Sequence, residues 1–238
     1  MTSTISVPAG KLRLMLTAVL PHANDDDTLP ALCGVNFEMC GGTLFLAATD
    51  RYTLGVAREQ VPGAIAAGVP DQSALLPLEA ARDLRRMLKK QAGDIAILIE
   101  DGNLKVEAGS VSGSWATVAK AKFPKWRTLI RPGLTGTTVP LGDGYGVNAE
   151  RLTRLAAGAR KTGEALRIRV LLPAKKDQDR GRPPMVAATV GDWFLGVVMP
   201  VRMDGAPAQW DDWTSVTAPA GKADDAAETA PEKPDAAS

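Results

Sequence analysis

Two stretches of the sequence decide the fold: residues 44–61 read LFLAATDRYTLGVAREQV, and residues 185–202 read MVAATVGDWFLGVVMPVR. Each stretch is a predicted pair of strands, with Ala-Ala-Thr near the turn and Leu-Gly-Val in the second strand. An internal repeat of this kind indicates that one supersecondary unit has been used more than once.

Three segments of the chain share one order of predicted elements: a short strand, a helix and then further strands. We therefore expect half-domains at 1–62, 63–135 and 136–204. The last stretch, 205–238, is rich in Ala, Pro, Asp, Glu and Lys. It has too few apolar side chains to fold by itself, and we expect a disordered tail.

Apolar residues recur at helical spacing in each of the three segments. Pro21 ends the first helix, Pro77 begins the second without losing a hydrogen bond, and Asn148 is suited to cap the third. The expected core stripes are Leu12, Met15, Leu16, Val19 and Leu20, then Ala80, Ala81, Leu84, Met87 and Leu88, then Leu152, Leu155, Ala156 and Ala159.

Strands account for most of the remaining ordered chain. They are expected near 31–39, 43–48, 53–61, 73–76, 95–100, 103–108, 114–120, 165–172, 185–190 and 193–199. Residues 121–146 are interpreted as a connector, and residues 175–184 as a polar loop. Trp210 and Trp213, at the start of the tail, either pack back onto the domain or form a docking motif, and packing back is the commoner outcome.

Composition excludes several classes of protein. The chain has 238 residues, 45% hydrophobic and 23% charged, with a net charge of +1, so no global basic field is present. Cys33 and Cys40 are separated by about 23 Å of extended chain, too far for a disulfide, which indicates a reducing, cytoplasmic location. The longest early apolar run, 12–20, is too short to cross a membrane.

The residues also argue against an enzyme. One histidine and two distant cysteines cannot form a zinc site, and no cofactor-binding motif is present. We expect His22 to lie in a surface loop, and Asp50 to cap a turn or pair with Arg51. Neither residue has neighbours in the sequence that would complete a catalytic set, so we predict no metal and no cofactor.

Positive charge is concentrated on the predicted helices. The three helices have eleven basic and three acidic residues, a helical net charge of +8 against +1 for the whole chain. The simpler explanation of this excess of basic residues is that solvated helix faces carry charge. Exposed helices, however, usually carry charges of both signs, because opposite charges four residues apart attract. A partner with negative charge, nucleic acid first, explains the imbalance better. The expected DNA-binding residues are Lys11, Arg13, Arg82, Arg85, Arg86, Lys89, Lys90, Arg151, Arg154, Arg160 and Lys161.

Several pieces of the sequence, in this order, resemble the bacterial DNA polymerase III β sliding clamp family. LPALCGVNFEM (29–39) and TLFLAATDRYTLGVARE (43–59) are similar to the strands that open the middle domain of the clamp. SALLPLEAARDLRRMLKK (73–90) resembles the second helix of that middle domain. FPKWRTLI (123–130) resembles the segment at the end of the same domain. VNAERLTRLAAGA, LRIRVLL and FLGVVMPVRM resemble the last half of the third domain.

This resemblance implies an α+β DNA-clamp fold with three copies of a strand–helix–strands half-domain and inward basic helices. It implies duplex DNA as one partner, and a DNA polymerase or other replication protein, bound through a short peptide motif, as another. The lining of the peptide pocket, carried over residue by residue, would be Thr49, Leu54, Pro77, Ala81, Met199, Pro200, Val201 and Arg202.

A bacterial clamp has six half-domains, and we count three in this chain. An unpaired half leaves a sheet edge open, which we expect self-association or a partner to cover. The first hypothesis is a phage-encoded processivity or recruitment platform for DNA replication in the host cytoplasm. The alternative is a clamp-fold adaptor, such as a phage recombination directionality factor that binds a serine integrase. A third hypothesis is an inhibitor that mimics a host clamp subunit.

Overall fold

The first two segments of the chain fold into the same succession of elements: one strand, one helix and three strands. The first comprises β1 (Ile5–Pro8), α1 (Ala9–Val19), β2 (Gly34–Cys40), β3 (Thr43–Thr49) and β4 (Thr53–Gln60). The second comprises β5 (Gln72–Pro77), α2 (Leu78–Met87), β6 (Asp94–Glu100), β7 (Asn103–Ala108) and β8 (Val111–Ala116). Short 3-10 turns, η1 (Leu20–His22) and η2 (Leu88–Lys90), extend the two helices.

A computed structural model gives this fold. It describes residues 4–64, 68–100, 102–119, 122–134, 145–173, 175–178, 181 and 183–202. The predicted tail, with Trp210 and Trp213, and the middle of the predicted connector lie outside the described residues. Among the described helices, none is long and apolar enough to span a membrane.

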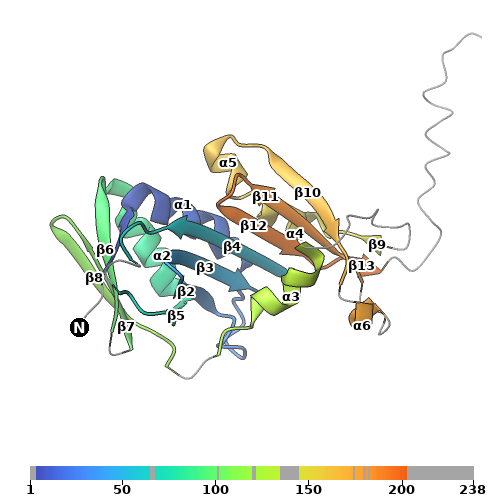
Figure 1. The fold of residues 1–238 in the computed structure, drawn as a ribbon, viewed down its shortest axis with the longest axis horizontal. Coiled ribbons are helices and arrows are strands. Elements are labelled where there is room, and N and C mark those ends of the chain that lie inside the picture. Colours follow the sequence, from blue (N-terminus) through green and yellow to red (C-terminus); the bar gives the residue numbers. More distant parts are fainter. Residues whose placement is uncertain are drawn as a thin grey trace, which may run out of the picture. The chain divides into compact units, whose positions relative to one another are not determined.

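The two segments exchange their first strands. β1 of the first segment pairs with β6, in a sheet of order β1-β6-β7-β8. β5 of the second segment pairs with β2 of the first, at one edge of a seven-stranded sheet. Each segment therefore completes a sheet of the other, and neither has a full set of strand partners by itself (Figure 1).

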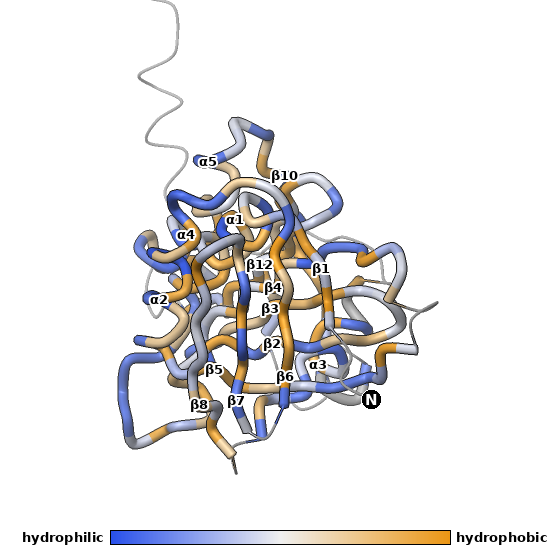
Figure 2. The backbone as a smooth tube through the Cα atoms, turned by 90° about the vertical axis from the view of Figure 1, so that its left-hand side faces the viewer, coloured by the Kyte–Doolittle hydropathy of each residue, from blue (hydrophilic) through white to orange (hydrophobic). Residues whose placement is uncertain are grey.

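The helices α1 and α2 lie between the two sheets and form the main core. Leu12, Met15 and Leu16 of α1 and Leu84 of α2 are fully buried, which confirms the helical stripes predicted for these segments. They share one cluster with apolar residues of both sheets. Figure 2 shows the four-stranded sheet in front, with α1 and α2 behind it. The seven-stranded sheet packs on the other side of the two helices, and strands of the third segment belong to it.

The third segment extends the seven-stranded sheet. Its elements are β9 (Tyr145–Gly146), α4 (Ala149–Leu155), α5 (Ala159–Thr162), β10 (Leu166–Leu171), β11 (Met185–Val190), β12 (Phe194–Val198) and β13 (Val201–Arg202). The large sheet has the order β10-β11-β12-β4-β3-β2-β5, and β9 pairs only with β13. Asn148 caps α4 as predicted, because its side-chain oxygen accepts a hydrogen bond of 3.1 Å from the Arg151 backbone N–H.

The two copies of the sequence repeat meet in the centre of this sheet. β4 and β12 pair antiparallel, with Gly55 directly opposite Gly196. A Cβ on Gly55 would overlap the ring of His22, and a Cβ on Gly196 would overlap the side chain of Leu155. Glycine is therefore needed in both strands, because a large side chain from a helix end packs directly on the backbone.

Three sequence-based expectations about helices are not met by the structure, and others are corrected with the site below. The predicted connector contains a helix, α3 (Trp126–Leu134), which places Trp126 and Ile130 in an apolar cluster on the sheet. The predicted polar loop contains the short helix α6 (Lys175–Gln178). Leu152, expected in the core, is 37% exposed, because α4 ends three residues later and only Leu155 reaches the sheet.

Candidate functional site

The turn between β3 and β4 is the most highly connected polar element of the described structure. One carboxylate oxygen of Asp50 accepts hydrogen bonds from the backbone N–H groups of Tyr52 (2.9 Å) and Thr53 (2.6 Å) and from the Thr53 hydroxyl (3.0 Å). Asp and Asn favour turns because they bond to nearby backbone in this way. Arg51 takes the left-handed conformation, with φ of 79°, that this tight turn requires.

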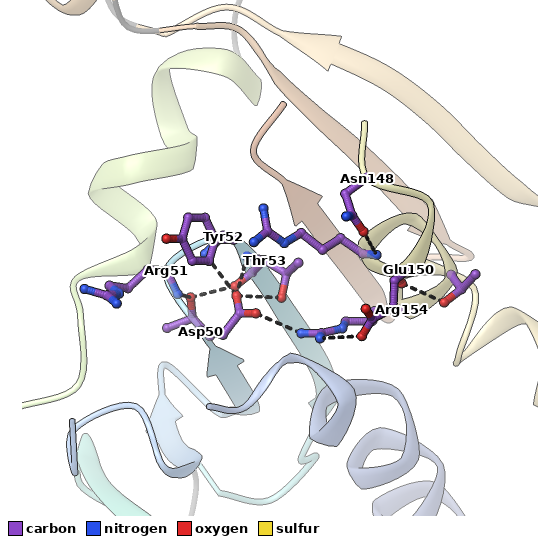
Figure 3. A network of polar contacts seen from close by, with 10 residues as sticks. Asp50, Arg51, Tyr52, Thr53, Asn148, Glu150 and Arg154 are labelled. Carbon is purple, nitrogen blue, oxygen red and sulfur yellow. Dashed lines mark hydrogen bonds and ion pairs between the residues drawn. The ribbon is translucent and has the colours of Figure 1, made fainter. Parts of the chain in front are cut away.

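The other carboxylate oxygen of Asp50 joins this turn to the third segment. It accepts a hydrogen bond of 2.8 Å from Arg154 of α4, and the other nitrogen of the Arg154 guanidinium contacts Glu150 at 3.2 Å. The expected pairing of Asp50 with Arg51 is therefore wrong, and its expected role as a turn cap is confirmed. Figure 3 shows the Asp50 carboxylate between the turn and α4.

Two further contacts hold the turn against the third segment. The Arg151 guanidinium lies 3.9 Å from the centroid of the Tyr52 ring, a cation–π geometry. The Met199 backbone N–H donates to the Tyr52 carbonyl at 2.8 Å. The turn, α4 and the end of β12 therefore form one connected unit.

His22 lies beneath this junction, and the prediction of a surface-loop histidine is wrong. Its side chain is fully buried between Gly55 and Phe194, with ring centroids of His22 and Phe194 6.1 Å apart. Neither ring nitrogen has a hydrogen-bond partner among the described residues. Burial lowers the pKa of His22 to about 4; the nearby charge of Asp50 acts to raise it and that of Arg154 to lower it.

Five of the eleven predicted DNA-binding side chains make contacts within the chain. Arg82 pairs with Glu79, and Arg86 pairs with Asp83, both across one turn of α2. Lys11 pairs with Glu59 at 3.1 Å and lies over the Trp193 ring. The other two are Arg151 and Arg154, whose contacts with Tyr52, Asp50 and Glu150 are given above.

The other six have no ion pair among the described residues. Five are exposed and Arg85 is half-buried. Lys89 and Lys90 are in η2, which packs beside α1, the helix that carries Arg13. The six are Arg13, Arg85, Lys89, Lys90, Arg160 and Lys161.

A second apolar cluster covers the face of the large sheet opposite α1. Trp126 and Ile130 of α3 pack there against Leu54 of β4 and Val197 of β12, and Met199 borders them. A groove of about 330 Å³ runs beside α3. Its apolar lining includes Phe45, Val56, Ile130, Leu134 and Leu195.

The predicted peptide-pocket residues are only partly brought together. Thr49 is opposite Leu54 in the β3–β4 pair, and Met199 bonds to the same turn. Pro200 follows Met199, and Val201 and Arg202 form β13. Pro77 and Ala81 do not join them: Pro77 is in β5, three strands from β4, and Ala81 is fully buried in the main core. None of the eight lines the groove beside α3.

Sequence reasoning missed Arg127. Its guanidinium lies over the rings of Phe45 and Trp126, with its carbon 4.5 Å and 4.2 Å from their centroids, and donates to Glu38 at 2.6 Å. One of its nitrogens and the Trp126 indole nitrogen are buried without a partner among the described residues. The sequence signal for Arg127 was its position directly after Trp126, close to Phe123 and Pro124. A helix was not expected there, so the stacking of Arg127 on aromatic rings was not predicted.

The described residues contain no group of three or more His, Cys, Asp or Glu side chains suited to a metal ion. What these residues offer instead is a set of helical cations, without an ion pair in the described part of the chain, on one side of the large sheet and an apolar groove on the other. These are the components of binding surfaces.

Comparison with known proteins identifies the family. The family model described as "DNA polymerase III beta subunit, central domain" matches residues 6–125, half of the chain. The chain belongs to the DNA polymerase III beta subunit family. The match covers β1 to β8, the two segments that exchange their first strands.

Individual relatives agree with this assignment. The chain is 32% identical over 135 residues to the beta sliding clamp of Streptomyces coelicolor, covering 54% of this chain and 34% of that protein. It is 24% identical over 141 residues to the beta sliding clamp of Pseudomonas aeruginosa, covering 58% and 36%. The matched region therefore spans about a third of the length of these curated relatives.

Solved structures show the same fold over more of the chain. The sliding clamp of Pseudomonas aeruginosa superposes with a TM-score of 0.62 at 17% identity, covering 84% of this chain and 67% of that chain. A Pseudomonas aeruginosa clamp bound to griselimycin gives 0.60 at 18% identity, covering 89% and 68%. The beta subunit of Thermotoga maritima gives 0.56 at 18% identity, covering 84% and 66%. The predicted clamp fold is confirmed.

Proposed function

We propose that this protein is a DNA-associated, non-catalytic accessory factor that acts as a sliding-clamp-like processivity or recruitment platform, in phage DNA replication in the host cytoplasm. The observation that carries the proposal is the clamp fold of the chain together with helical cations that have no ion pair among the described residues. Phosphate binding needs cations and no specific chemistry, so such a surface is sufficient for DNA binding without base contacts.

The proposed DNA contacts are the six unpaired cations defined above. Lys89 and Lys90 are the most suitable for testing, because they are adjacent, exposed and without an ion pair among the described residues. The paired arginines of α2 have part of their charge neutralised by Glu79 and Asp83. Arg154, held by Asp50, is proposed to act in the structure of the junction and not in DNA binding.

A salt titration of duplex DNA binding tests this proposal. Each phosphate contact contributes about −0.9 to the slope of log affinity against log salt, so Lys89→Glu with Lys90→Glu should flatten that slope by about 2 for duplexes of any sequence. Arg167→Glu with Arg169→Glu on β10 is the matched control, because the same charge change is made on exposed strand residues. An unchanged slope in the Lys89/Lys90 variant would count against the proposal.

The apolar face around α3 is the proposed site for a replication protein, such as a DNA polymerase. Its groove has apolar anchors of the kind that bind short motifs, and Met199, at the border of the apolar cluster, adds an adaptable side chain. Griselimycin, which is bound to the Pseudomonas aeruginosa clamp in one related structure, is a suitable small probe. Saturable binding of griselimycin, competed by polymerase peptides, would support a shared ligand site.

A second candidate function is a clamp-fold adaptor, such as a recombination directionality factor that binds a serine integrase. Five of the eleven predicted cations have contacts within the chain. Fewer of them are therefore available to bind phosphate, and this favours the adaptor. The variants above separate the two functions. Integrase binding that Lys89→Glu with Lys90→Glu abolishes, while DNA binding is unchanged, would support the adaptor.

Self-association is the last part of the proposal. The sheets have edge strands with no partner strand among the described residues. Sheet edges of this kind invite pairing with another chain. We propose that the chain forms a homo-oligomer.

A further inference from the structure

A second cleft lies where the chain passes from β8 to α3. After β8 the chain is held at the edge strand β5, because the Val118 backbone N–H donates to the Leu75 carbonyl at 2.9 Å. Residues 122–125 then lead into α3, which packs on the face of the large sheet opposite α1. The cleft between these residues and the strands β5 and β2 has a volume of about 810 Å³, within the usual range for ligand sites.

The sheet side of this cleft is polar. Asn36 and Glu38 of β2 and Ser73 of β5 line it. Ser73 is opposite Glu38 in the strand pair, and its hydroxyl donates to the side-chain oxygen of Asn36 at 2.9 Å. One carboxylate oxygen of Glu38 accepts a hydrogen bond of 2.6 Å from a guanidinium nitrogen of Arg127. The chain itself therefore already supplies donors to an oxygen of Asn36 and to an oxygen of Glu38.

Two hydrogen-bond donors at the start of α3 are not used in this way. The indole nitrogen of Trp126 and the second guanidinium nitrogen of Arg127 are buried and have no partner among the described residues. Both residues line the cleft, and Trp126 is only 9% exposed. A buried donor without a partner is unfavourable, so these nitrogens are suited to a ligand with acceptor atoms. The forked guanidinium of Arg127 can hold Glu38 through one nitrogen and a second oxyanion through the other.

Positive charge surrounds these two donors. Lys122 and Lys125 line the same cleft and are exposed, and neither has an ion pair in the described part of the chain. With Arg127 they give three basic side chains in the described lining, against the single acid Glu38. A cleft with one predominant sign of charge raises the local concentration of ligands of the opposite sign. The ligand is therefore an anion.

The remaining lining favours a peptide over nucleic acid. Leu75, Ile99, Val118 and Phe123 provide apolar walls, which suit the side chains between the acids of a peptide. Single strands of nucleic acid bind through aromatic rings on which bases stack, but the Arg127 guanidinium already lies over the Trp126 ring. Aspartate and glutamate carboxylates also match the fork of an arginine in shape.

We infer that this cleft binds an acidic segment of a protein partner, with one carboxylate held by the Trp126 indole N–H and the second guanidinium nitrogen of Arg127. Lys122 and Lys125 attract the neighbouring acids of that segment. The inference goes beyond the proposed function, because it concerns a second partner site. It requires neither DNA binding nor a motif in the groove beside α3.

A defined acidic peptide tests the inference on the full chain. The probe is a fluorescent peptide in which aspartate and leucine alternate, and the matched peptide has asparagine in place of each aspartate. We expect wild type to bind the aspartate peptide at least tenfold more tightly than the asparagine peptide. Lys122→Glu with Lys125→Glu should raise the Kd of the aspartate peptide at least tenfold. Arg167→Glu with Arg169→Glu makes the same charge change on β10 and should leave this Kd unchanged.

The Trp126 indole N–H reports directly on the buried donor. Its resonance can be assigned by NMR, because it is the one lost in Trp126→Phe. We expect this resonance to shift when the aspartate peptide is added, and to stay in place when the asparagine peptide is added. A resonance that does not move while the aspartate peptide binds would refute the role of the Trp126 donor.

Further outcomes would overturn the inference. Failure of wild type to bind the aspartate peptide would do so, as would equal binding by the Lys122/Lys125 variant. Loss of binding in Leu134→Ala would place the peptide in the groove beside α3 instead. Displacement of the peptide by a single-stranded oligonucleotide would indicate a nucleic-acid site. The salt slope for duplex DNA should be the same in the Lys122/Lys125 variant and the wild type, so DNA binding is judged separately.

Discussion

Asp50 and Arg154 are 104 residues apart in the sequence, and their side chains are joined at 2.8 Å. The pair links the turn of the first repeat copy to α4, which packs against the second. Both side chains are mostly buried, 13% and 25% exposed, so water screens the pair less than a surface ion pair. The third segment is therefore anchored to the family-matched part of the chain by one carboxylate as well as by the β4–β12 strand pair.

Asp50→Ala should destabilise the protein by about 1.5–3 kcal/mol, the range for hydrogen bonds to a charged group. The change removes the turn cap and leaves Arg154 with Glu150 alone. A double-mutant cycle with Arg154→Ala, read by urea unfolding, should give a coupling energy of about 1–2 kcal/mol. Glu150→Ala, at a side chain that is 80% exposed, is the control and should change stability by under about 0.5 kcal/mol. Additivity of the Asp50 and Arg154 changes would contradict the link.

Stability should fall on mild acidification because His22 is buried in its neutral form. Its pKa is about 4 in the folded protein against 6.5 for the free side chain, so below pH 6.5 the unfolded state binds more protons. Stability is lost as the pH falls from about 6.5 towards 4, by roughly 2 kcal/mol between pH 7.5 and 5. His22→Leu should remove that part of the pH dependence in urea unfolding. Equal slopes in the two proteins would show that His22 is not responsible.

Local patterns in the sequence predicted the elements well, because helical and strand periodicity depend on near neighbours. The stripe of α1 and the cap at Asn148 follow from spacing and side-chain chemistry alone. Pairing between distant strands leaves no such trace, so the β4–β12 junction and the partner of Asp50 could not be derived. The positive charge was counted correctly, but which arginines pair with acids depends on side-chain geometry.

Two errors had a signal that was available. His22 follows Met15 and Val19 at helical spacing, which continues the buried stripe of α1, but the adjacent Asn and Asp residues favoured a loop. Trp126 and Ile130 have the spacing of a helix face, but the Pro and Gly residues that follow favoured a connector. In both places the composition of the neighbouring loop outweighed a short periodic pattern.

Gly55→Ala should destabilise the protein by about 1–3 kcal/mol, the cost of overpacking a filled core. The new Cβ would overlap the His22 ring at the β4–β12 junction. His22→Ala in the same chain should recover part of this loss, because it removes the overlapping ring. Gly10→Ala is the matched control: Gly10 lies in α1 with no atom close to an added Cβ, so stability should rise by about 0.5–1 kcal/mol. A neutral Gly55→Ala would contradict the close packing.

The apolar face around α3 should bind a short motif through its exposed anchors. Leu134 is 50% exposed at the groove, so Leu134→Ala should weaken a bound peptide at least tenfold with little change in stability. Met199→Ala tests the other end of the same cluster. The probe is an overlapping peptide set from a bacterial replicative DNA polymerase, read by fluorescence anisotropy. Ile168→Ala, at an exposed residue of β10 outside the groove, is the control for Leu134. If Leu134→Ala and Met199→Ala both bind every peptide as the wild type does, the partner site lies elsewhere on the chain.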